Sequence, residues 1–99
     1  MPTPRPRHIV ILTFPDGLLL DAAGPLEAFN TADLLGATAG LRPGSLYRVH
    51  LASASGGLIR MSNGVPVFTE KLDAALIRRT DTLLVAGGPG ARKAIDDTN

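Results

Sequence analysis

HIVILTFPDG, residues 8–17, and DTLLVAGGPG, residues 81–90, decide the fold of this chain. Each is a short apolar run that ends in turn residues and leads into a helical pattern. The continuous, β-branched run at residues 9–12 is typical of a strand buried on both faces, and such strands are parallel. The two turns therefore mark the carboxyl ends of parallel strands, the edge at which α/β sheets form their ligand crevice.

The rest of the sequence predicts an α/β domain with a parallel sheet and helices on both faces. Proline at a first helical position loses no hydrogen bond, so a helix is expected to begin near Gly24-Pro25 and to end at Gly36. Asn63-Gly64 between two apolar runs predicts a β-hairpin, and Thr69 is expected to cap a short helix. The expected strands are residues 9–12, 47–52 (more exposed), 58–61, 65–68 and 82–85, and the expected helices are 24–36, 69–77 and from 90 onward.

Composition limits the classes of function. The 99 residues form one small domain at most, and 44% hydrophobic residues with 19% charged residues are typical of a globular chain. The net charge is +1, without a basic stripe interleaved with aromatic residues, so we expect these residues not to bind DNA by themselves. Zero cysteines exclude a disulfide framework and a thiol nucleophile within the sequence. We expect no metal and no cofactor, because His8 and His50 each stand alone on a strand.

The amino-terminal residues bear on localisation. Residues 1–7, MPTPRPR, have no apolar h-region behind them, which predicts a disordered leader and not a signal peptide. No apolar run approaches the roughly 18–20 residues of a membrane span. The default expectation is a cytoplasmic protein that does not contact a membrane.

Asp21 is the ionisable residue that stands out, because it lies between Leu18–Leu20 and Ala22-Ala23. It has two interpretations. As a helix cap, its carboxylate would accept the backbone N–H of Gly24. As a ligand-binding or catalytic group, it would turn back into the crevice beside the second turn. Glu27 has a simpler explanation, as a capping-box residue near the start of the helix.

Gly87, Gly88, Pro89 and Gly90 form the second turn of the expected crevice. A strand-to-helix turn of this kind exposes consecutive backbone N–H groups that can bind an anion or an oxyanion. It is neither a dinucleotide fingerprint nor a phosphate-binding P-loop, since it lacks the GxGxxG spacing and the lysine. We therefore take Asp21 and residues 87–90 as the candidate ligand-binding residues.

Residues 8–99 resemble the first half of the ThiJ/PfpI superfamily, flavodoxin-like relatives of class I glutamine amidotransferases. The resemblance rests on short motifs along the whole sequence: Phe14-Pro15-Asp16-Gly17, Leu20-Asp21, Gly24-Pro25-Leu26-Glu27-Ala28-Phe29, Ser62-Asn63-Gly64 and Asp81–Val85 with Gly87-Gly88. More narrowly, the chain looks like the amino-terminal domain of GlxA-type transcriptional regulators of the AraC family. The resemblance implies a pocket beside Gly87-Gly88, with a nucleophile, usually cysteine, on a turn beyond residue 99.

Two functions follow from this resemblance. The first is an effector-sensing and dimerisation domain of an AraC-family regulator, which would bind a small-molecule effector and would reach DNA only through a carboxy-terminal region outside this sequence. The alternative is a ThiJ/PfpI-type hydrolase or an isonitrile hydratase-like enzyme, with Asp21 as acid/base and a cysteine downstream of residue 99. Apart from the resemblance, a stand-alone structural fragment without activity is a third possibility. In either case we expect this half-sheet to pack against a second copy or against the remainder of its own domain, because soluble proteins avoid open strand edges.

Overall fold

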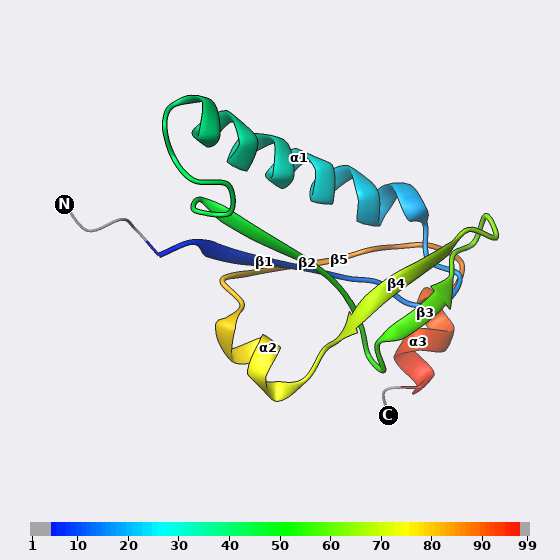
Figure 1. Cartoon of the computed structure of the whole chain (residues 1–99). Coiled ribbons are helices and arrows are strands. Elements are labelled where there is room, and N and C mark those ends of the chain that lie inside the picture. The colour runs from blue at the N-terminus through cyan, green and yellow to red at the C-terminus, as the bar shows by residue number, and fades with distance from the viewer. Residues whose placement is uncertain (1–4, 98–99) are drawn as a thin grey trace.

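The computed structural model describes residues 5–97, which form a five-stranded sheet with three helices (Figure 1). The strands lie side by side in the order β3-β4-β2-β1-β5. Their bounds are β1 Arg7–Leu12, β2 Tyr47–Ser53, β3 Gly57–Arg60, β4 Pro66–Lys71 and β5 Thr82–Val85. β1 pairs in parallel with β2 and β5, and β2 pairs in parallel with β4. The predicted α/β class with a mostly parallel sheet is thus confirmed.

β1 is central in the parallel part of the sheet. Ile9, Val10 and Ile11 are at most 2% exposed, as the continuous apolar run predicted. Each buried side chain of this size contributes about 1.5–3 kcal/mol to folding. The register Ile11↔Leu51 and Ile11↔Leu84 aligns the carboxyl ends of β1, β2 and β5 at one edge.

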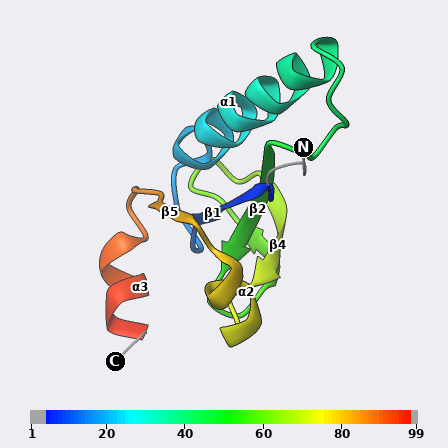
Figure 2. The same ribbon diagram turned by 90° about the vertical axis from the view of Figure 1, so that its left-hand side faces the viewer.

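The helices cover both faces of the sheet. Helix α1 (Leu19–Thr38) lies on one face, and α2 (Ala74–Arg79) and α3 (Ala91–Asp97) lie on the other (Figures 1 and 2). On the first face, the rings of Phe29 and Tyr47 make an edge contact with centroids 5.1 Å apart. On the second face, Leu76 of α2 packs with Val10 and Ala52.

Helix α1 begins five residues earlier than predicted. The prediction placed the start at Gly24-Pro25, whereas the helix starts at Leu19 after an extended Leu18, and Pro25 lies inside it. No side chain caps this start, so no local signal marks it. Glu27 consequently lies in the middle of the helix and not in a capping box. The helix also continues past Gly36 to Thr38.

The hairpin prediction is confirmed, but the helix after it was misplaced. β3 and β4 pair antiparallel around the Asn63-Gly64 turn. Thr69 lies within β4, where its hydroxyl donates to the Gly57 carbonyl at 2.7 Å. The residue that caps α2 is Asp73, whose carboxylate accepts the Leu76 N–H.

β5 is more exposed than the prediction of a buried strand implied. Within residues 5–97 it pairs on one side alone, with β1. Leu83 is 49% exposed and Val85 is 65% exposed. Leu83 is in register with Val10 and Val85 with Leu12. Val10 packs with Leu76 of α2, so these residues lie on the face of the sheet that carries α2.

The expected leader at residues 1–7 is partly corrected. Residues 1–4 lie outside the described part of the chain, whereas Arg7 opens β1 and its N–H donates to the Leu46 carbonyl at 3.0 Å. Arg5 is held by an ion pair with Asp81 at 2.8 Å. Among the residues that the structure describes, no helix is both long and apolar enough to cross a membrane.

Candidate functional site

Two turns pack together at the carboxyl edge of the sheet. The turn after β1 donates the Leu18 N–H to the Gly87 carbonyl at 2.8 Å, and the turn after β5 donates the Gly90 N–H to the Asp16 carbonyl at 3.1 Å. These paired hydrogen bonds fix the segment after β1 against the segment after β5. The convergence predicted from parallel-strand geometry is confirmed.

The second turn approaches the first so closely that two positions require glycine. A Cβ at Gly90 would lie 2.0 Å from the Pro15 carbonyl oxygen, and a Cβ at Gly88 would lie 2.6 Å from the Leu18 nitrogen. Gly88 also has a φ of +132°, which L-residues rarely adopt. The glycines therefore allow backbone-to-backbone contact at the site.

Asp21 faces the second turn and does not cap the helix. Its Oδ2 accepts the N–H of Gly87 at 3.0 Å, and α1 has already begun two residues before it. The capping interpretation, with Gly24 as donor, is therefore wrong. The side chain is also exposed and not buried in the apolar setting that its neighbours in sequence indicated.

The arrangement leaves hydrogen-bonding capacity for a small polar ligand. Asp21 Oδ1 has no partner within residues 5–97, and no acceptor in the same residues pairs with the Gly88 N–H. A ligand donor could bind Asp21 Oδ1, and a ligand acceptor could bind the Gly88 N–H. Pro89 has no N–H, and the Gly90 N–H is used by Asp16, so these two residues shape the turn and do not donate to a ligand.

Thr13 is a residue of this edge that the sequence reasoning missed. It follows β1 directly, is 1% exposed, and its Oγ1 has no hydrogen-bond partner among the described residues. A Cβ at Gly17 would lie 2.8 Å from that hydroxyl. Thr13 lies beneath the turn and not on its outer surface. The signal in the sequence that could have indicated Thr13 was a polar residue directly after a buried strand.

His8 and His50 were predicted to stand alone, and this prediction is wrong. His8 Nδ1 lies 3.0 Å from His50 Nε2, and His50 Nδ1 lies 2.9 Å from Glu70 Oε2. Burial lowers the pKa of His8, and His50, Arg79 and Arg48 lower it further, against the opposing effect of Asp81. These three side chains form a row across β1, β2 and β4. The row meets β1 in its amino-terminal half, away from Asp21. No group of three residues within 5–97 is arranged to hold a metal ion.

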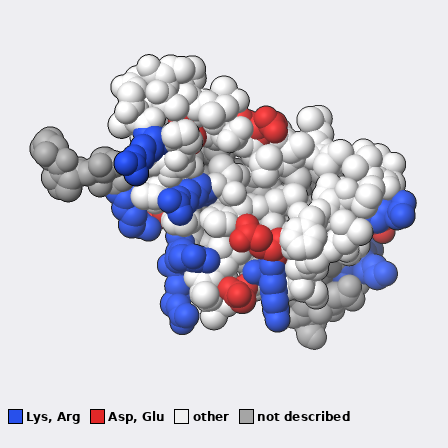
Figure 3. Space-filling view, in the orientation of Figure 1, with Lys and Arg blue, Asp and Glu red and all other residues white. Residues whose placement is uncertain are grey.

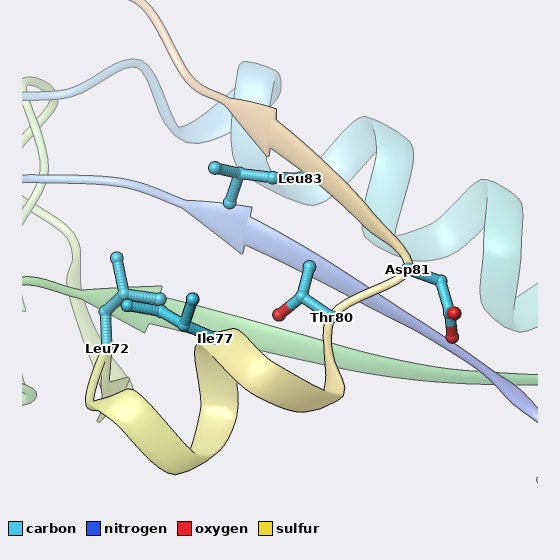
Figure 4. A pocket seen from close by; sticks show the side chains of 5 residues that line it. All are labelled: Leu72, Ile77, Thr80, Asp81 and Leu83. Atoms are coloured by element: carbon cyan, nitrogen blue, oxygen red, sulfur yellow. The ribbon is translucent and has the colours of Figure 1, made fainter.

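An apolar hollow of about 370 Å³ lies between α2 and β5 (Figure 4). Leu72, Ile77 and Leu83 line it with Thr80 and Asp81. The Asp81 carboxylate points away from these apolar side chains, toward Arg5 and the His8 N–H that it binds. The hollow therefore offers packing surface and few polar contacts, which separates it from the Asp21 site.

Comparison with known proteins gives one sequence relative and one structural neighbour of note. No family model matches the sequence. A Streptomyces lividans protein named "Uncharacterized protein in cpoL 5'region" is 37% identical over 86 residues, which make up 87% of this chain and 55% of that protein.

The structural neighbour is a crystal structure of an AraC family transcriptional regulator from Pseudomonas putida. It matches with a TM-score of 0.69 and 19% sequence identity over 93% of this chain and 57% of that one. The chain thus spans about half the length of both matched proteins. Its described residues have the mixed α/β fold, with a mostly parallel sheet, of the matched part of that regulator.

Proposed function

We propose that this chain is the effector-sensing and dimerisation part of a cytoplasmic transcriptional regulator of the AraC family, of the GlxA type within the ThiJ/PfpI superfamily. DNA would be bound by a carboxy-terminal region outside these 99 residues. The small-molecule effector would bind at the carboxyl edge of the sheet, between Asp21 and the turn at residues 87–90.

The observation that carries the proposal is the Asp21–Gly87 hydrogen bond, which joins the two turns at the carboxyl edge of a sheet whose fold an AraC family regulator shares. The contact leaves the second carboxylate oxygen of Asp21 without a partner among residues 5–97, close to a turn whose Gly88 N–H also has none there, which suits a small polar effector. Glycines at 88 and 90 allow the backbone of one turn to pack directly against the other, which brings residue 87 within reach of Asp21.

The exposed apolar side of β5 supports the dimerisation part of the proposal. Leu83, Val85 and Ile77 are 49%, 65% and 56% exposed, and Leu83 and Ile77 border the apolar hollow. Such an area is typical of a surface that another subunit or further chain covers. The partner would be a second copy or the remainder of the same domain.

Chromatin immunoprecipitation of the encoded protein in its host, with sequencing, tests the proposal. We expect enrichment at a small number of promoters, and we expect transcription from them to change when the gene is deleted. A protein without promoter enrichment, whose deletion leaves transcript levels unchanged while a small molecule accumulates, would instead support the hydrolase or hydratase interpretation.

A further inference from the structure

A second, differently charged hollow lies at the opposite edge of the sheet, where β1 and β2 begin. Its volume is about 310 Å³. It is lined by three segments: Arg5-Pro6, the loop Arg42–Ser45, and Arg48 of β2. In Figure 3, Lys and Arg side chains gather on the left, over the starts of β1 and β2 and, below them, over α2.

The loop that forms one wall is held from below by Asp33 of α1. The Asp33 carboxylate is buried and accepts the backbone N–H groups of Gly44, Leu46 and Tyr47. Gly44 has a φ of +81°, which favours glycine at this bend. The wall is therefore fixed before any ligand arrives, which lowers the entropic cost of binding.

The opposite wall is fixed as well. Arg5 pairs with Asp81 at 2.8 Å, and Arg7, two residues on, donates its N–H to the Leu46 carbonyl at 3.0 Å. Arg48 Nε donates to the Gly44 carbonyl at 3.4 Å, which ties this side chain to the loop. Arg5 and Arg48 are thus held by contacts within the described residues.

Two groups in this hollow have unused hydrogen-bonding capacity. The exposed Arg42 guanidinium has no partner within residues 5–97. The Ser45 hydroxyl is buried and has no hydrogen-bond partner in the described residues. An arginine fork and a hydroxyl donor are the groups that recognise a phosphate, because guanidinium donates two parallel hydrogen bonds to its oxygens.

We propose that this hollow, which we call the arginine pocket (Arg5, Arg42, Ser45 and Arg48), binds a small ligand through a phosphate group. Arg42 and Arg48 supply the charge-assisted hydrogen bonds, and a rotation of the Ser45 side chain toward the ligand would let its hydroxyl, which is buried without a partner among the described residues, supply a neutral one. The Asp33 carboxylate behind the loop and Asp81 beside Arg5 offset part of the positive charge. The volume is at the lower end of small-molecule sites, so the ligand is a free phosphate or a small phosphomonoester, not a large cofactor.

The proposal is independent of the effector site, because the pocket lies at the other edge of the sheet from Asp21. The test is titration of the protein with inorganic phosphate, at constant ionic strength, followed by amide NMR signals. We expect shifts confined to the amide signals of Arg5, Arg42 and residues 44–48, since Pro6 and Pro43 have no amide N–H. Glycerol 3-phosphate as a second probe distinguishes the two sources: tighter binding than that of free phosphate identifies a phosphomonoester site.

Arg42→Gln is the test variant, since the Arg42 side chain has no partner within residues 5–97, and its carbonyl keeps the Ser45 N–H in the variant. We expect it to weaken phosphate binding about 10-fold or more, the loss of one charge-assisted contact. Arg78→Gln, which removes the same charge from exposed Arg78 on α2 outside the pocket, is the matched control and should change binding less than about twofold.

Three results would overturn the proposal. One is the absence of shifts at residues 42–48 in wild type at millimolar phosphate. Another is equal weakening by Arg42→Gln and Arg78→Gln, which would mean a diffuse charge effect and no built pocket. The third is salt-sensitive binding of a short DNA duplex that displaces phosphate, which would make this edge a nucleic-acid surface.

Discussion

Replacing Gly90 by alanine is expected to destabilise the protein by roughly 3 kcal/mol or more, a large share of the total stability of a domain this small. The new Cβ would lie 2.0 Å from the Pro15 carbonyl oxygen and 3.0 Å from the Asp16 Cβ. Neither the oxygen nor its backbone can rotate away, because Asp16 is held by its own N–H to the Arg60 carbonyl at 2.9 Å. Urea unfolding followed by circular dichroism measures the change.

Two control variants separate close approach from other effects of removing a glycine. Gly57 has a φ of +80°, and a Cβ added there would meet nothing within 4 Å, so Gly57→Ala should cost only the left-handed backbone penalty of about 1–2 kcal/mol. Gly24 lies in α1 with open space, and alanine there should stabilise by about 0.5–1 kcal/mol. If Gly90→Ala lowered the free energy of unfolding no more than Gly57→Ala does, the two turns would not pack as described.

Asp33→Ala is expected to have the next largest effect, a fall in melting temperature of about 10 °C. The substitution leaves the N–H groups of Gly44, Leu46 and Tyr47 without their acceptor in a part-buried site. Asp33→Asn keeps one acceptor oxygen, so its melting temperature should lie between those of wild type and Asp33→Ala. Differential scanning calorimetry of the three proteins at pH 7 tests this order, and equal melting temperatures would contradict it.

The same carboxylate makes stability depend on pH in a defined direction. The hydrogen bond from Gly44, then those from Tyr47 and Leu46, lower the pKa of Asp33 below its ordinary 3.8. At this carboxylate the unfolded chain therefore binds a proton more readily than the folded chain does. The contribution of Asp33 to the free energy of unfolding is present above pH 3.8 and is lost as the pH falls through the lower pKa of the folded state. Below about pH 4 the wild type should lose stability more steeply than Asp33→Asn.

The sequence predicted the carboxyl-edge convergence because it depends on general rules. Buried parallel strands end at one edge, and the runs at 9–12 and 82–85 were readable as such strands. The Asn63-Gly64 hairpin was equally readable, because its turn residues act locally. These features need no knowledge of which side chains meet.

The errors concern features set by tertiary contacts. The start of α1 carries no capping side chain, and the turn before it is fixed by the Leu18–Gly87 hydrogen bond, which the local sequence does not encode. The His8–His50 contact depends on the register His8↔Arg48, and a shift of that register would separate the rings. The Asp33 anchor joins a helix to a loop 11 to 14 residues away, without a recognisable motif.

The measurement that tests the central claim most directly is a ligand-binding NMR screen of wild type and Asp21→Asn. Asparagine keeps the size of the side chain and an acceptor for the Gly87 N–H, so the fold should be retained. With a library of small polar compounds, we expect binders that shift the amide signals of Gly87 and Gly88 in wild type and bind at least about 10-fold more weakly to Asp21→Asn. Binders that leave those signals unmoved, or that bind both proteins equally, would contradict an effector site at Asp21.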